Sequence, residues 1–163
     1  MKLDQVTAFK VPRSILISTE NAIRKAGEEG YECFVLWSGL LDSDNETFEV
    51  VTAHIPEQKS FKTPEGLLVR VEGPALHKLN AALYESGEVL AVQIHAHPHE
   101  AYHSRTDSGF PIVTALGGLS IVAPDFATRG VLTIGTAAYR LQQFGWKKVP
   151  RRKLQRVVQV VDN

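Results

Sequence analysis

The sequence predicts one α/β or α+β domain, in which a central mixed β-sheet is flanked by two or three helices. The chain has 163 residues, within the range of roughly 100–200 residues typical of one domain and long enough to bury its own core. Two helical patterns alternate with about six strand patterns, which favours a layered sheet-and-helix fold. No segment repeats at a fixed period, so a solenoid or a propeller is disfavoured. We therefore treat residues 1–163 as a single domain.

The N-terminal half is predicted to contain one helix and three strands. Apolar residues recur at helical spacing from about residue 12 to residue 30, and Gly27 and Gly30 lie where such a helix would end. Residues 31–41 are rich in aromatic and β-prone side chains, and the polar cluster at 42–45 predicts a turn into a second strand at 48–55. Residues 56–66 are predicted to be a polar connection, and residues 67–71 a short strand.

The C-terminal half begins with a second predicted helix at 72–87, which has Leu76, Leu79 and Leu83 on one face and ends at Gly87. The apolar run at 89–95 predicts a buried strand. A short helix is expected at 107–117, and further strands at 119–123 and 131–140. Six Lys and Arg residues lie between Lys147 and Arg156. A solvated surface is the favoured interpretation of this stretch, with a docking patch for an acidic partner as the alternative.

Composition excludes several classes of protein. Lys and Arg total 18, as do Asp and Glu, so the net charge is zero, and 44% of residues are hydrophobic. This balance disfavours disorder and nucleic-acid binding. A single cysteine, Cys33, rules out an intrachain disulfide and favours a reducing, cytoplasmic compartment. The first 20 residues lack the apolar core of a signal peptide, and the longest uncharged stretch, 108–124, is too short and interrupted to span a membrane.

The residues that carry chemistry cluster after the strand at 89–95. Four of the six histidines fall within the nine residues 95–103. His95 and His97 lie two apart, so both imidazoles are expected on the same face of a strand, where they can grip a cation. An oxygen ligand from Asp107, ten residues after His97, would give the three protein ligands of an open catalytic zinc site. Ser104 and Asp107 also fit a capping box that starts a helix.

This constellation resembles the motif of the JAMM (MPN+) zinc metallopeptidases. The pattern His95-x-His97, six further residues and Ser104-x-x-Asp107 is accompanied upstream by Glu32 in G-Y-E-C-F-V-L-W-S-G and downstream by A-L-G-G-L-S-I-V-A-P-D-F. The similarity runs from about residue 12 to residue 126. It implies a single catalytic domain with a cytidine-deaminase-like MPN sandwich fold, and one catalytic Zn²⁺ held by His95, His97 and Asp107. It also implies that Glu32 is the general base and acid, and that Ser104 donates a hydrogen bond to the metal-bound water or the developing oxyanion.

Two positions depart from the family pattern. Family members commonly have seven residues between the second histidine and the serine, where this chain has six, and Ser, Thr or Asn is usual at the position of Ala96. The shorter loop makes His103 an alternative to Asp107 as the third ligand. Asp107 is favoured because Ser104-x-x-Asp107 keeps its internal spacing.

The resemblance implies a peptidase or isopeptidase that cleaves after the C-terminal tail of a ubiquitin-like protein. A bare domain of this kind is similar to prokaryotic members that accompany ubiquitin-activating-like and conjugating-like enzymes, or that act in anti-phage defence. Two alternatives remain. One is a non-catalytic MPN-type scaffold, which is disfavoured because every ligand position is filled. The other is a peptidase of the same type that processes a sulfur-carrier protein.

Several other reactive side chains have simpler interpretations. Cys33 is expected to pack as a small hydrophobic residue. His54 and His77 are isolated and are expected to have structural or surface roles. His99, like His103, is a candidate for a contact to the metal ligands or the substrate, or for an exposed loop residue, and the sequence does not rank these.

Overall fold

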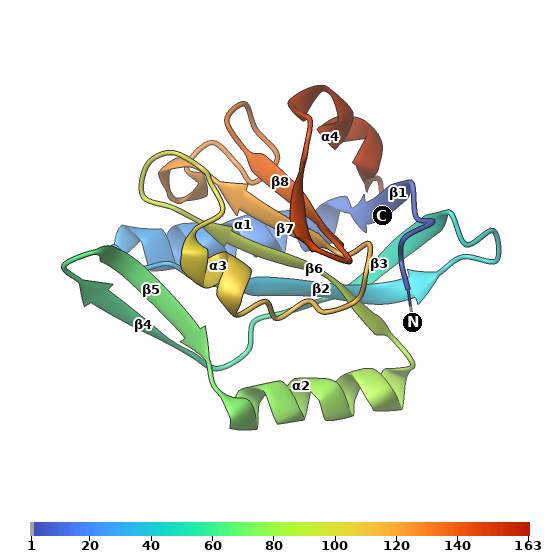
Figure 1. Ribbon diagram of the computed structural model, residues 1–163, viewed down its shortest axis with the longest axis horizontal. Helices are drawn as coiled ribbons and strands as arrows, with labels where there is room; N and C mark the ends of the chain where they lie inside the picture. The colour runs from blue at the N-terminus through green and yellow to red at the C-terminus, as the bar shows by residue number, and fades with distance from the viewer. Residues whose placement is uncertain (1) are drawn as a thin grey trace.

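The computed structural model describes residues 2–163, whose helices and strands are shown in Figure 1. In chain order the elements are β1 (Ala8–Pro12), α1 (Arg13–Glu28), β2 (Val35–Leu41), β3 (Thr47–His54), β4 (Gln58–Thr63), β5 (Gly66–Val71), α2 (Gly73–Ser86), β6 (Val89–Ala96), α3 (Arg105–Gly109), β7 (Leu119–Ala123), a 3-10 turn (Asp125–Ala127), β8 (Ala137–Gln142), β9 (Gly145–Val149), α4 (Arg151–Val157) and β10 (Val158–Val161). Eight strands form one mixed sheet in the order β10-β1-β3-β2-β6-β7-β8-β9, and β4 pairs with β5 in a separate hairpin. The α/β (α+β) class is confirmed, with four α-helices in the described residues.

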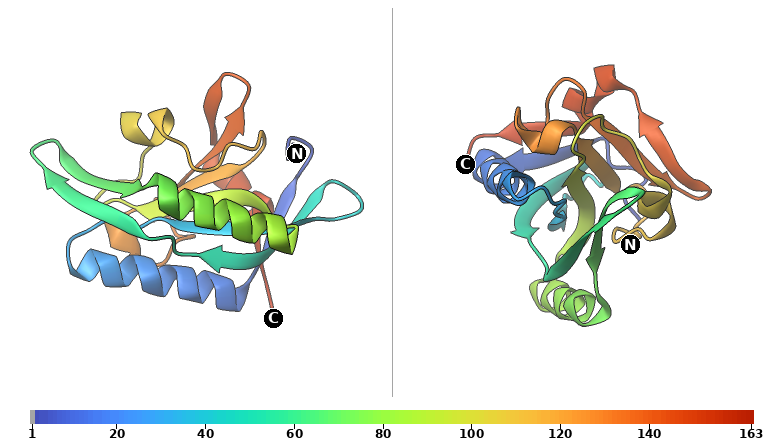
Figure 2. Two further views of the ribbon diagram at one scale, coloured as in Figure 1. Left: turned by 90° about the horizontal axis from the view of Figure 1, so that it is seen from below. Right: turned by 90° about the vertical axis from the view of Figure 1, so that its left-hand side faces the viewer.

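The two longest helices cover opposite faces of the sheet, as Figure 2 shows. Successive side chains of a strand point to opposite faces, and β2 shows the division clearly. Trp37 belongs to the large core cluster that includes Ile23 of α1, whereas its neighbour Leu36 packs with Leu79 and Leu83 of α2. Because both faces are covered, the central strands are buried on both sides. No helix within residues 2–163 is long and apolar enough to cross a membrane.

One buried hydrogen bond ties α1 to β2. The indole of Trp37 is fully buried, and its Nε1 donates to Oγ1 of Thr19 at 2.8 Å. The isosteric change Thr19→Val leaves that N–H without an acceptor, so we expect the free energy of unfolding to fall by about 1–3 kcal/mol in urea titrations. The control is Ser18→Ala, whose exposed hydroxyl donates only to the Ile15 carbonyl, and which should change stability much less. Equal stability of the two variants would contradict this account.

Strand β6 separates the apolar core from the polar site. Val92, Ile94 and Ala96 belong to the large core cluster on the side of α1. By strand alternation, Gln93 and His95 lie on the other face. Parallel pairing continues just beyond the strand, because the His97 N–H donates to the Ala123 carbonyl of β7 at 3.0 Å. His97 is therefore held in strand-like geometry on the same face as His95, as predicted.

The structure differs from the sequence prediction mainly at the edges of the sheet. The helices at 13–28 and 73–86 and the strands β2, β3, β5, β6 and β7 match predicted elements. Strand β4 lies inside the stretch predicted to be a connection. It pairs only with β5, in a hairpin outside the large sheet, so most of its side chains are polar and exposed and show no apolar pattern. Strands β1 and β10, which pair in parallel at one edge, were not predicted, and neither was β9 at the other edge.

Two elements of the second half are shorter than predicted. Helix α3 is limited to residues 105–109, whereas the prediction placed a helix at 107–117. The apolar run at 131–140 turns before it becomes strand β8 at Ala137. In this turn, Oγ1 of Thr136 donates to the Val131 carbonyl at 2.6 Å, and Gly135 has a φ of 101°. The Lys and Arg side chains between Lys147 and Arg156 are exposed, which agrees with a solvated surface, but their backbone forms most of β9 and α4.

Candidate metal centre

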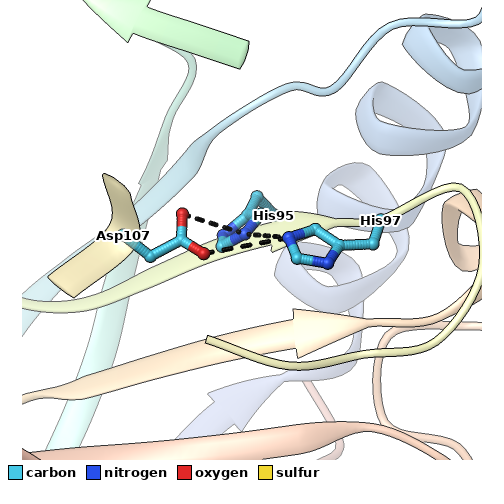
Figure 3. Close-up of side chains that lie close together, drawn as sticks. All are labelled: His95, His97 and Asp107. Carbon is cyan, nitrogen blue, oxygen red and sulfur yellow. Dashed lines mark hydrogen bonds and ion pairs between the residues drawn. The ribbon is translucent and has the colours of Figure 1, made fainter. Parts of the chain in front are cut away.

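Three side chains, from β6, from the residue just after it and from α3, point toward one another (Figure 3). His95 comes from the end of β6, His97 follows directly after that strand, and Asp107 comes from α3. The Nε2 atoms of the two histidines are 3.2 Å apart. Oδ1 of Asp107 is 3.4 Å from Nε2 of His95, and Oδ2 is 3.8 Å from Nε2 of His97. One ligand atom from each residue lies within 4.8 Å of the others, so the structure brings together all three predicted ligands.

The charge states of these groups fit a bound cation. Burial is the larger cause, and the nearby His95 the smaller one, that together lower the pKa of His97 to about 4. This imidazole is therefore neutral at neutral pH, with a lone pair available for a metal. Burial alone would raise the pKa of Asp107, but hydrogen bonds with His95 and Ser104 hold it well below its usual range. Two imidazole nitrogens and a carboxylate that share one small volume are the donor set of an open zinc site. The residues present therefore fit a divalent metal ion.

The two histidine rings are oriented in different ways. His95 is fully buried, and its ring packs against Phe34 with 4.9 Å between the ring centroids. Its Nδ1 has no hydrogen-bond partner among residues 2–163, so packing sets the direction of this ring. The ring of His97 packs edge-on against Tyr102, with 4.6 Å between centroids. Both rings thus have little freedom to turn their Nε2 atoms away from Asp107.

Asp107 is fixed by the start of its own helix. Its Oδ2 accepts a hydrogen bond from the Ser104 backbone N–H at 2.7 Å, and its own N–H donates to Oγ of Ser104 at 3.1 Å. These two bonds form the capping box predicted from the sequence. Ser104 lines the same cavity as His97 and Asp107, and a serine hydroxyl can donate one hydrogen bond while it accepts another. Its role toward the oxyanion stays a prediction.

Glu32 approaches the three ligands from the segment between α1 and β2. Its Oε1 is 3.9 Å from Nε2 of His97, and only 10% of the side chain is exposed. Burial raises the pKa of Glu32 to about 7, since the favourable effect of His95 is smaller than the cost of desolvation. A carboxyl group whose pKa is near neutral pH, and which lies beside the metal ligands, is suited to accept and return a proton.

Strand β4 holds this glutamate segment in place. Oγ of Ser60 donates to the Glu32 carbonyl at 2.9 Å. The amide side chain of Gln58 bonds both backbone groups of Phe34, with its Oε1 2.7 Å from the N–H and its Nε2 3.0 Å from the carbonyl oxygen. Gln58 and Ser60 therefore lie on one face of β4, and their side chains bond backbone groups of the Glu32 segment as the backbone of a neighbouring strand would. Neither residue was predicted from the sequence, because the strand that carries them has no apolar pattern.

In the metal-free protein, the buried charge of Glu32 is expected to make stability depend on pH. Its pKa is raised from 4.5 to about 7 on folding, so between these pH values the folded state keeps a proton that the unfolded state releases. The free energy of unfolding therefore falls as the pH rises from 4.5 through 7. We expect Glu32→Gln to stabilise the metal-free protein at pH 8 by about 1–3 kcal/mol and to change it little at pH 4.5.

The measurement is urea unfolding in the presence of a chelator at the two pH values. The control is Glu65→Gln, which changes an exposed glutamate in the turn between β4 and β5. A stability difference for Glu32→Gln that is the same at both pH values would show that this carboxyl is not held in a desolvating site.

A cavity of about 760 Å³ opens beside the metal ligands. Residues 66–69 of β5 line one side, and residues 97–100 together with Tyr102 line another. Glu32, His97, Ser104 and Asp107 also lie in its wall. The candidate metal centre is therefore accessible to a substrate, and the β4–β5 hairpin forms one wall of the approach.

The remaining histidines of the cluster are placed differently from the metal ligands. His99 is exposed and lines the cavity. The ring of His103 lies between two serines, with Nδ1 3.1 Å from Oγ of Ser108 and Nε2 3.1 Å from Oγ of Ser120. Asp107 therefore completes the ligand cluster, whereas His103 does not belong to it.

The other reactive side chains have structural or surface positions. Cys33 is buried, and burial raises its pKa to about 11, as expected of a small hydrophobic residue. Nε2 of His54 lies 2.6 Å from Oγ of the buried Ser38, away from the metal ligands. His77 is exposed on α2.

The chain resembles proteins of known sequence and structure. No family model matches it. The probable metalloprotease y4jG of Sinorhizobium fredii (strain NBRC 101917 / NGR234) is 35% identical over 159 residues, which cover 97% of each chain. The solution structure of a protein from Desulfitobacterium hafniense matches with a TM-score of 0.63 and 13% identity over 95% of this chain and 94% of that one. A solution structure from Salinibacter ruber matches with a TM-score of 0.52 and 20% identity, over 92% and 89%.

These findings carry different weight. The two solution structures are too distant in sequence to indicate more than a shared fold. The similarity to the Sinorhizobium protein extends over nearly the full length of both chains, and so spans the segments that form the candidate metal centre. The chain therefore belongs to the same protein family as the probable metalloprotease y4jG of Sinorhizobium fredii.

Proposed function

We propose that this protein is a zinc-dependent peptidase of the JAMM (MPN+) type. The observation that carries the proposal is the convergence of His95, His97 and Asp107, with the raised-pKa carboxyl of Glu32 at 3.9 Å from His97. The name of its Sinorhizobium relative, a probable metalloprotease, supports the same reaction class. Two imidazoles and one carboxylate are ligands that suit zinc in an open, catalytic site.

The protein residues divide the work of hydrolysis. A zinc ion, when bound, supplies Lewis-acid polarisation of the scissile carbonyl and makes water more acidic. Glu32 takes a proton from the attacking water as the C–O bond forms. It then delivers that proton to the leaving amine as the C–N bond breaks. Ser104 donates its hydroxyl hydrogen to the oxyanion that develops on the carbonyl oxygen.

The substrate we propose is the extended C-terminal tail of a ubiquitin-like protein, joined to its partner by a peptide or isopeptide bond. The cavity wall supports an extended ligand, because β5 pairs only with β4 among the described strands and its other edge has free backbone groups. An extended peptide can add to such an edge as a further strand. In this proposal, ubiquitin-activating-like and conjugating-like enzymes form the substrate, as in bacterial conjugation or anti-phage defence systems.

The test combines metal content with cleavage of a fusion to a ubiquitin-like protein encoded near this one. We expect about one zinc per chain, and cleavage after the tail that is lost in Glu32→Ala. Bound zinc with no cleavage of any such fusion or conjugate would overturn the proposed substrate. Release of a sulfur-carrier protein from a short adduct would instead support the sulfur-carrier alternative. Purified protein that holds no metal and takes none up would revive the non-catalytic scaffold.

A further inference from the structure

His103 lies in a site built from hydrogen bonds and aromatic rings. Each of its ring nitrogens is 3.1 Å from a serine hydroxyl, Nδ1 from Ser108 in α3 and Nε2 from Ser120 in β7. Its backbone N–H donates to the Tyr139 hydroxyl at 3.2 Å. Its ring packs against Tyr139 and Trp146, with ring centroids 4.7 and 5.3 Å away. The half-buried imidazole is thus held by two hydrogen bonds and two aromatic rings, and it connects the helix of Asp107 to the sheet.

This contact is part of a network that reaches the strand of the histidine ligands. Nε2 of Gln93 donates to Oγ of Ser120 at 3.2 Å, and the two residues are register partners on β6 and β7. Oε1 of Gln93 accepts the backbone N–H groups of Ile112 and Val113 at 3.0 and 2.9 Å. Gln93 is two residues before His95 on the same face of β6. The network therefore holds the chain both before and after α3.

Asp107 needs such anchoring because its own helix is short. Helix α3 has five residues and none of them is buried. A helix of this length is not stable by itself, because its few internal hydrogen bonds do not offset the cost of nucleation. The capping box orients the Asp107 carboxylate relative to α3, but it does not position α3 relative to β6. That second task depends on contacts outside the helix.

We infer that His103 is a positioning residue, which holds α3 against β7 through Ser108 and Ser120 so that Asp107 faces His95 and His97. This inference rests on the metal centre of the proposed function. Outer residues that orient metal ligands commonly contribute 10–100-fold to metal affinity. His103 therefore sets the affinity for the metal without touching it.

The experiment is a competition titration of zinc against a chromophoric chelator, with Co²⁺ absorption spectra of the same variants. We expect His103→Ala to weaken zinc binding about 10–100-fold and to alter the Co²⁺ ligand-field bands. His103→Gln, which can still bond one of the serines, should restore part of the affinity. His77→Ala, at an exposed histidine on α2, is the matched control and should bind zinc like the wild type.

Thermal unfolding of the metal-free variants separates positioning from general stability. If His103→Ala does not fold, Ser108→Ala tests the same link, because it removes one hydrogen bond from an exposed side chain of α3. Wild-type zinc affinity and an unchanged Co²⁺ spectrum in a folded His103→Ala protein, or in Ser108→Ala where His103→Ala does not fold, would overturn this inference and leave the proposed function intact. A wild-type protein that binds no zinc would overturn both.

Discussion

The variant Glu32→Gln is expected to retain its metal and to lose most of its activity, with kcat/KM lowered by about 10²–10⁴-fold. Gln is close to Glu in shape, so the contacts of the segment with β4 should persist, but the amide cannot accept a proton. Oε1 of Glu32 lies 3.9 Å from Nε2 of His97 and does not belong to the compact ligand cluster. The loss should therefore appear in turnover and not in zinc content.

The measurement is steady-state hydrolysis of a ubiquitin-like fusion, together with zinc analysis of the same preparations. Glu65→Gln is the control, because this exposed glutamate lines the same cavity at the turn between β4 and β5. Its kcat should stay within a few-fold of the wild type. Activity of Glu32→Gln close to that of the wild type would remove Glu32 from the chemistry, and loss of zinc from this variant would make it a ligand instead.

The variant Asp107→Asn is expected to lose metal affinity by more than about 100-fold, beyond the range usual for residues that only orient ligands. Asp107 provides the negative charge of the three-residue cluster, and its oxygens lie 3.4 and 3.8 Å from the two Nε2 atoms. An amide keeps an oxygen that can accept the Ser104 N–H, so the start of α3 should survive. The change therefore removes charge and ligand strength with little change of shape.

Calorimetric titration with zinc checks this expectation, and unfolding in a chelator checks that the variant is folded. Arg105→Ala is the control, since Arg105 is exposed in the first turn of the same helix. It should bind zinc as the wild type does. If Asp107→Asn bound zinc with unchanged affinity, Asp107 would not be a ligand, and the third position would have to be filled from elsewhere in the cavity wall.

The accuracy of the fold prediction depended on how an element is buried. Helices α1 and α2 were predicted well, because each packs one stripe of apolar residues against a sheet and so shows a helical period. Strands β6 and β7 were found because they are central, buried strands made almost entirely of apolar residues, which form compact apolar runs in the sequence. Strand β4, with the sequence Q-K-S-F-K-T, has no such pattern. The basic residues of β9 and α4 are exposed, so they carry no periodic apolar signal.

The residues of the candidate site also differ in how far the sequence predicts their positions. His95 and His97 were predicted to share a face because they are two apart on a strand, and the capping box placed Asp107 at a helix start. Glu32 was matched by resemblance to the JAMM motif and not by spacing, since 63 positions separate it from His95. In the structure Asp107 lies with His95 and His97, whereas the His103 ring turns toward Ser108 and Ser120.

By itself, the sequence determined the local geometry of this protein: the helical and strand periods, the shared face of two histidines, and the cap that orients Asp107. These features depend on residues that are only a few positions apart in the chain, so their spacing is enough to predict them. Tertiary structure alone decided that Gln58 and Ser60 hold the Glu32 segment, and that Gln93, Ser120 and His103 anchor α3. Those contacts join elements distant in the chain, and their partners are selected by sheet order and packing, which no local spacing encodes.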